Sequence, residues 1–130
     1  MIRFRKYDKE NRIDKAWYDS SNIVYSECDD HINALKTLRI VFKTGDMYEY
    51  DNVDVNDYLM FMAGGLDGSN GKAFYKFIRN KYEARKMDPV NLDELNAKME
   101  ELKEAKKKEL EAGIGLVETE EKVEENTDKK

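Results

Sequence analysis

The sequence predicts a small α+β domain in which an antiparallel sheet of three to four strands packs with two short helices. Leu38, Ile40 and Phe42 alternate with Arg39, Val41 and Lys43, which is typical of a strand with one apolar face toward a core. Residues 44–46 (Thr-Gly-Asp) then indicate a hairpin, because glycine accepts a positive φ. Beyond residue 54 the apolar spacing changes to three and four, which is typical of helices.

The remaining strands are predicted from shorter patterns. Residues 2–5 alternate and predict a short strand, residues 8–12 form a turn, and residues 13–18 either pair back or lead into the main domain. Residues 23–26 are β-prone, and residues 47–53 return from the hairpin. Strands joined by short turns imply an antiparallel meander.

Two short helices follow the hairpin. Asp54 is a suitable N-cap for the first helix, and Gly64-Gly65 ends it. Ser69 or Asn70 caps the second helix. The apolar stripe of the second helix consists of Phe74, Phe77, Ile78 and Tyr82.

A separate amphipathic helix is predicted after Asp88-Pro89, because proline disfavours a helical conformation in the residue before it. Asn91 and Glu94 have the spacing of a capping box. An a/d seam of about two heptads follows, made by Leu92, Leu95, Met99 and Leu102. Gly113 is expected to end this helix, and the acidic residues 114–130 are expected to be disordered.

These boundaries divide the chain into an N-terminal arm or strand (1–16), a domain (17–87), the amphipathic helix (88–113) and the acidic tail (114–130). Residues 1–87 hold 15 Lys/Arg and 14 Asp/Glu, a charge of +1, whereas residues 88–130 hold 8 and 14, a charge of −6. Neither value is the strongly basic charge of a dedicated nucleic-acid-binding protein, although a local basic stripe is compatible with both.

Composition also indicates the compartment. The single cysteine excludes an internal disulfide and fits a reducing compartment. The charged N-terminus has no apolar core of a signal peptide, and no segment approaches the ~18 apolar residues of a membrane span. We therefore expect a soluble cytoplasmic protein.

Five motifs in residues 17–82 resemble, in their order and spacing, the KTSC domain, a small module found at the C-terminus of some lysyl-tRNA synthetases. They are Ser21-Asn22-Ile23, Phe42-Lys43-Thr44-Gly45, Tyr48-Glu49-Tyr50, Ser69-Asn70-Gly71-Lys72-Ala73-Phe74 and Ile78-Arg79. The chain departs from the family pattern at Asp54, where proline is usual, at Tyr75, where asparagine is usual, and in an enlarged loop at residues 30–36. The resemblance implies a scaffold for which RNA binding is suggested.

Aromatic and basic residues within this pattern are candidates for a nucleic-acid surface. Tyr48 and Tyr50 share one face of a strand, where they either stack bases or belong to the core, and the structural role is favoured. Lys72, Lys76 and Arg79, at i, i+4 and i+7 of the second helix, form either a phosphate-facing ridge or the solvated side of that helix. The complete candidate set is Arg39, Lys43, Tyr48, Tyr50, Lys72, Lys76 and Arg79.

Catalytic and metal motifs are not found. Residues 65–72 do not form a P-loop, because Leu66 and Ala73 replace the required glycine and Ser/Thr. Cys28 and His31 are close in sequence but lack an orienting partner or a second metal half-site. We therefore expect a non-catalytic protein with no metal and no cofactor.

Three functions remain open. The first is binding of RNA or single-stranded DNA. The second is a role as a protein-interaction or assembly component of the phage or mobile-element type, in which the seam from Leu92 to Leu102 packs on a partner or on itself. The third is binding of a nucleotide or another small anion.

Overall fold

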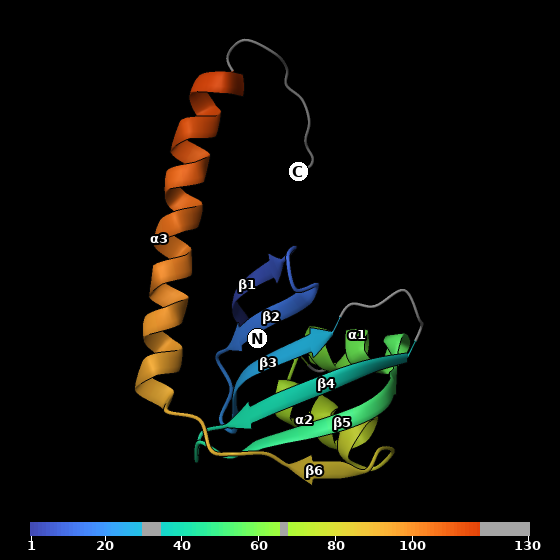
Figure 1. Ribbon diagram of the computed structural model, residues 1–130. Coiled ribbons are helices and arrows are strands. Elements are labelled where there is room, and N and C mark those ends of the chain that lie inside the picture. The colour runs from blue at the N-terminus through green and yellow to red at the C-terminus, as the bar shows by residue number, and fades with distance from the viewer. Residues whose placement is uncertain (30–34, 66–67, 118–130) are drawn as a thin grey trace. The chain divides into compact units, whose positions relative to one another are not determined.

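The computed structural model describes residues 1–29, 35–65 and 68–117, the last five of these as backbone only, and the chain divides into two units between Leu95 and Asn96. Its sheet has six antiparallel strands in the order β1-β2-β3-β4-β5-β6, so each strand pairs with its neighbours in sequence (Figure 1). The strands are β1 (Ile2–Asp8), β2 (Ile13–Tyr18), β3 (Ile23–Asp29), β4 (Leu35–Phe42), β5 (Met47–Asp54) and β6 (Ala84–Lys86). The helical elements are α1 (Val55–Ala63), α2 (Asn70–Phe74), the π-helical turn η1 (Tyr75–Arg79) and α3 (Leu92–Val117).

The α+β class and the antiparallel meander are confirmed, and the sheet has six strands rather than the three or four that we expected. The strand expected at residues 2–5 is part of β1, and residues 13–18 pair back as β2, from Ile2–Tyr18 to Asp8–Ile13, so the N-terminal arm belongs to the sheet. The strand that we did not expect is β6, which pairs with β5 over three exposed residues. So short and polar a segment carries no hydrophobic alternation from which a strand could be predicted.

The two short helices cover one face of the sheet, behind it in the view of Figure 1. Alternate residues of the strands point toward these helices and form the hydrophobic core with them. Phe74 of α2 lies at the centre, with its ring centroid 5.3 Å from that of Phe42 and 5.9 Å from that of Tyr50. The buried core consists of Ala16, Tyr18, Ile23, Cys28, Leu38, Ile40, Tyr50, Val53, Tyr58, Phe61, Met62, Phe74 and Ile78.

The predicted N-caps of the two short helices and the end of the first are confirmed, whereas Tyr82, expected in the stripe of the second helix, lies beyond η1, which ends at Arg79. Asp54 accepts a hydrogen bond from the Asn56 backbone N–H at 2.7 Å, and Ser69 accepts one from the Lys72 N–H at 3.2 Å. Gly64 ends α1 with a φ of 81°. A Cβ at this position would lie 2.5 Å from the carbonyl carbon of Gly68, so only glycine fits there.

Residues 87–95 leave β6 and pass the end of the β4–β5 hairpin. The Val90 N–H donates to the carbonyl of Gly45 at 2.8 Å, and the Trp17 indole donates to the carbonyl of Leu95 at 3.2 Å. The N-cap of α3 is confirmed, because Asn91 accepts from the Glu94 N–H at 3.1 Å. The helix then continues through Gly113 to Val117, so the expected stop at this glycine is wrong. Glycine inside a helix costs only about 1 kcal/mol, which its neighbours can offset.

Two expectations concern residues that the structure does not describe: the disorder of the acidic tail and the absence of a site formed by Cys28 and His31. Most of the acidic tail, residues 118–130, and His31 lie outside the described residues. In the part of the chain that the structure describes, no helix combines the length and the apolar character needed to cross a membrane.

Candidate functional site

Two adjoining hollows lie on the helix side of the sheet, where the ends of β4 and β5 meet α2 and η1. The first has a volume of about 340 Å³ and the second about 430 Å³. Both are lined by Phe42, Tyr48, Phe74 and Tyr75. The first is also lined by Asn22, Ile23, Lys43, Thr44, Asp46 and Gly71, and the second by Tyr50, Arg79, Tyr82 and Ala84. We call the two hollows together the aromatic groove.

All five sequence motifs contribute residues to this groove. The turn after β4 supplies Lys43 because the strand ends at Phe42, where the alternation of faces also ends. The start of α2 supplies Gly71, and η1 supplies Arg79. The fold thus brings residues from 22 to 79 to one surface.

The aromatic side chains of the groove differ in accessibility. Tyr75 is 46% exposed, and its ring centroid lies 5.6 Å from that of the buried Phe74. Tyr48 is partly exposed and packs edge-on against Phe42 at 5.9 Å between centroids. Tyr50 is only 3% exposed, and burial raises the pKa of its hydroxyl to about 12. Of the two strand tyrosines, Tyr50 therefore belongs to the floor of the groove, whereas Tyr48 presents part of its ring.

Two exposed cations line the groove, and two more lie on the helical segment that carries its lining residues. Lys43 lies at the first hollow and Arg79 at the second, where its guanidinium carbon is 5.1 Å from the Tyr75 ring centroid. Lys72 and Lys76 are exposed on the same helical segment, and the Lys76 ammonium lies 5.4 Å from the ring centroid of Phe77. None of these four cations forms an ion pair with another described residue.

The first hollow also contains one carboxylate. Asp46 accepts a hydrogen bond from the Thr44 hydroxyl at 3.0 Å, and Lys86 lies 3.8 Å from its other oxygen. Its charge is therefore partly offset within the domain.

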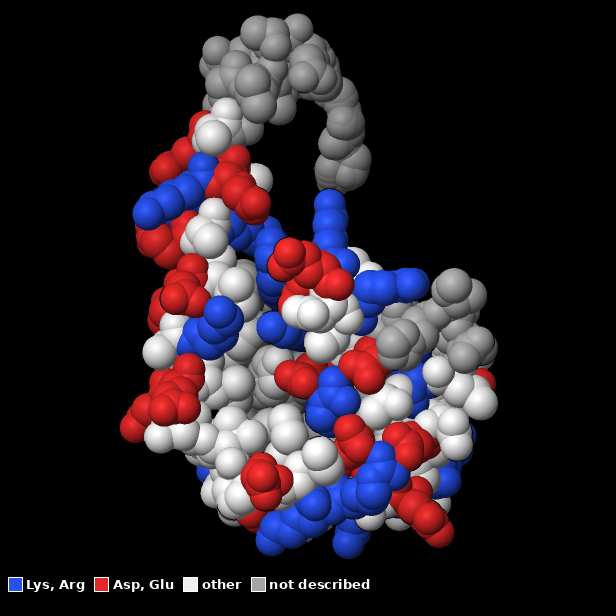
Figure 2. All heavy atoms as spheres, in the orientation of Figure 1, with Lys and Arg blue, Asp and Glu red and all other residues white. Residues whose placement is uncertain are grey.

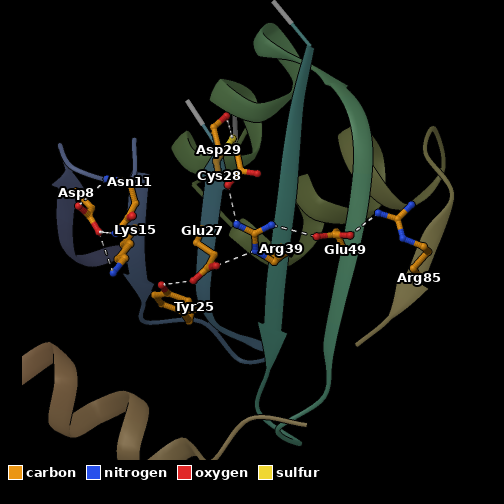
Figure 3. A network of polar contacts seen from close by, with 10 residues as sticks. All are labelled: Asp8, Asn11, Lys15, Tyr25, Glu27, Cys28, Asp29, Arg39, Glu49 and Arg85. Atoms are coloured by element: carbon orange, nitrogen blue, oxygen red, sulfur yellow. Dashed lines mark hydrogen bonds and ion pairs between the residues drawn. The ribbon is translucent and has the colours of Figure 1, made fainter. Parts of the chain in front are cut away.

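Arg39, the remaining predicted cation, lies on the opposite face of the sheet (Figure 3). It donates to Glu27 and Asp29 of β3, each at 2.7 Å, and to Glu49 of β5 at 3.0 Å. Partial burial opposes its charge, but the hydrogen bonds to Asp29 and Glu27 outweigh this and raise the pKa of the guanidinium above its ordinary value. Its donors are directed at carboxylates of its own domain.

This opposite face carries a ladder of alternating charges. The directly opposed residues across β2 to β6 are Lys15, Glu27, Arg39, Glu49 and Arg85. Arg85 also contacts Asp51. Acidic and basic side chains accordingly intermingle over the sheet in Figure 2. Opposite charges in directly paired positions stabilise a sheet, so we assign these residues a structural role.

The other predicted sites are placed as follows. Leu92 and Leu95 lie in the first unit of the chain and are partly buried, whereas Met99 and Leu102 lie in the second unit. Among the described residues, no group of three or more His, Cys, Asp or Glu side chains could hold a metal ion.

Sequence reasoning did not assign Tyr75, Asn22 or Tyr82 to the site. Tyr75 had a signal, because an exposed aromatic residue replaces the family's usual asparagine there. Asn22 belongs to one of the five motifs but carried no signal for binding, and Tyr82 carried none, since only the folded chain places them in hollows that Tyr48 also lines.

Comparison with known proteins identifies the scaffold. The model of the KTSC domain family matches residues 19–82, which confirms the resemblance found in the sequence. No curated protein matches the chain.

Proposed function

This chain carries a KTSC domain at residues 19–82, and we propose that the domain is a non-catalytic module that binds RNA or single-stranded DNA in the aromatic groove. The observation that carries the proposal is the combination of exposed aromatic rings with cations that have no acidic partner among the described residues. Stacking on an aromatic side chain contributes about 1–3 kcal/mol per base, and cations around it contact the phosphates.

The groove favours a single strand over a duplex. Tyr75 and Tyr48 can stack only on a base whose face is free, and bases inside a duplex are stacked on one another. The helix side is also the side on which the cations are available. On the opposite face, Arg39 and Arg85 are bonded to carboxylates.

The charges predict the salt dependence. If Lys43, Lys72, Lys76 and Arg79 each neutralise one phosphate, the logarithm of the affinity falls with the logarithm of salt concentration with a slope of about −3 for a single strand. Affinity should then fall roughly fifty-fold between 50 and 200 mM salt.

Fluorescence anisotropy with labelled 12-nucleotide RNA and DNA strands tests this proposal. The variant Lys72→Gln/Lys76→Gln/Arg79→Gln should bind much more weakly and with a shallower salt slope. The matched control replaces three exposed cations of the β1–β2 hairpin region, Arg3, Lys9 and Arg12, by glutamine and should bind as the unaltered chain does. Absence of binding at 50 mM salt would refute the proposal.

A protein-interaction role is the second candidate, and it is favoured by α3. This helix continues for more than twenty residues beyond Leu95, and Leu110 is 60% exposed on it. Helices gain most of their stability from packing an apolar face, so such a helix suits a partner or a second copy. Sedimentation of the chain and of a Met99→Ser/Leu102→Ser variant tests self-association. A monomer in both cases excludes it.

A further inference from the structure

The aromatic groove is made of two hollows rather than one, and the residues that distinguish them differ in chemistry. Only the first contains Lys43, Thr44 and Asn22. Only the second contains Arg79 and Tyr82. The residues common to both hollows are all aromatic: Phe42, Tyr48, Phe74 and Tyr75.

We infer that the groove is a two-nucleotide site, in which each hollow takes one of two consecutive nucleotides and Tyr48 and Tyr75 lie at the boundary between them. This inference rests on the proposed function and specifies the ligand. Volumes of about 340 and 430 Å³ lie at the lower end of the ~300–1,000 Å³ typical of ligand pockets. We assign one nucleotide to each hollow because each is of this modest size and carries one cation in its lining.

The charge distribution is complementary to two consecutive phosphates. Each hollow has one exposed cation in its lining, Lys43 in the first and Arg79 in the second. These cations belong to different elements, the turn after β4 and η1. The Asp46 carboxylate also lines the first hollow, and Lys86 at 3.8 Å partly offsets its charge.

Tyr75 is the residue that couples the two hollows. Its ring packs against the buried Phe74 on its own helix, and the Arg79 guanidinium lies 5.1 Å from its centroid. These two contacts hold the ring in place, so little side-chain freedom is lost when a base stacks on it. Because Tyr75 borders both hollows, replacing it weakens both.

Chain length gives the first test. Once one nucleotide is bound, a linked second nucleotide is presented to the other hollow at a local concentration in the millimolar range. Isothermal titration at 50 mM salt with a uridine mononucleotide, dinucleotide, trinucleotide and hexanucleotide should show a gain of at least tenfold from one nucleotide to two. The further gain from two to three should be small, because the inferred site takes one nucleotide in each of its two hollows.

Location gives the second test. In a two-dimensional ¹H–¹⁵N titration, the uridine mononucleotide should shift two groups of amides, one near Thr44 and Gly71 and one near Arg79 and Ala84. Lys43→Gln should weaken the first group of shifts alone, and Arg79→Gln the second alone. Both variants should reduce the affinity for the dinucleotide toward that for the mononucleotide.

The decisive variant is Tyr75→Asn, with Tyr7→Asn as its control, because Tyr7 is a comparably exposed tyrosine (39%) on β1. Tyr75→Asn should lower dinucleotide affinity roughly 5- to 150-fold, the range equivalent to one lost base stack, and should weaken both groups of shifts. Tyr7→Asn should change neither. Urea denaturation of both variants establishes that each is folded before binding is compared.

The outcomes separate the inference from the proposed function. If longer strands bind in the groove but one and two nucleotides bind equally well, or only one group of amides shifts, the two-nucleotide site is refuted while nucleic-acid binding stands. If no strand of any length binds, or the shifts surround Arg39 on the opposite face, both are refuted.

Discussion

Replacing Arg39 with methionine should destabilise the domain strongly and leave binding in the aromatic groove unchanged. Methionine keeps the length and apolar stem of the side chain but removes the charge and all donors. Glu27, Asp29 and Glu49, whose side chains are 14–23% exposed, would then face one another without the cation that joins them.

The magnitude follows from the contacts. Arg39 makes three charge-assisted hydrogen bonds of 2.7–3.0 Å, and such bonds contribute about 1.5–3 kcal/mol each. Breaking a fully buried ion pair costs about 3–5 kcal/mol. Because the Arg39 side chain is 15% exposed and its carboxylates can regain some hydration, we expect a loss of about 2–4 kcal/mol in the free energy of unfolding.

Urea denaturation followed by circular dichroism measures this loss, and Arg85→Met is the matched control. Arg85 also contacts two carboxylates on the same face, but its side chain is 53% exposed, so solvent screens its ion pairs. The control should therefore lose far less stability than the Arg39 variant. Equal losses for the two variants would refute the assignment of Arg39 as the centre of the charge ladder.

The same variant tests the role of Arg39 in binding. At a temperature where both proteins are folded, Arg39→Met should bind single strands like the unaltered chain, whereas Arg79→Gln should bind more weakly and unfold normally. Weakened binding by folded Arg39→Met would return this residue to the candidate nucleic-acid surface.

Three further predictions concern stability. Tyr58→Phe removes the 2.7 Å hydrogen bond from the buried Tyr58 hydroxyl to Asp14 and should cost about 1–3 kcal/mol in urea denaturation; a smaller loss would mean that Asp14 finds another donor. Ser69→Ala removes the N-cap of α2 and should cost about 1 kcal/mol, whereas Ser69→Asp should restore most of the loss; equal stability of all three proteins would contradict the cap. Burial raises the pKa of the Tyr50 hydroxyl to about 12. The contribution of this hydroxyl to the free energy of unfolding is therefore complete below its unfolded pKa of about 10 and is lost as the pH rises through 12. Denaturation curves at pH 8, 10 and 11 should show the stability falling above pH 10, and Tyr50→Phe should reduce this fall.

Local sequence predicts the elements whose causes are local. The hairpin at Gly45 and the caps at Asp54 and Ser69 depend on one glycine conformation or one side chain within three residues, and all agree with the structure. The strand β6 was not predicted, because it forms by pairing with β5, which lies more than thirty residues earlier in the chain. The continuation of α3 through Gly113 was not predicted either, because the cost of about 1 kcal/mol for a glycine inside a helix is small.

In the candidate site, too, some properties follow from the local sequence and others only from neighbours in space. The sequence alone determined the family, the hairpin, and the list of aromatic and basic residues from which a site could be built. The sequence could not show which of Tyr48 and Tyr50 is exposed, or which of Arg39 and Lys43 is ion-paired, because the residues of each pair have similar local sequence surroundings. Tertiary structure separated them. Phe74, distant in sequence, buries Tyr50, and carboxylates on β3 and β5 pair with Arg39. Lys43 lies just past the end of its strand, and no ion pair joins it to another described residue. Burial and charge pairing are properties of neighbours in space, so only the folded chain decides which of these side chains face a ligand.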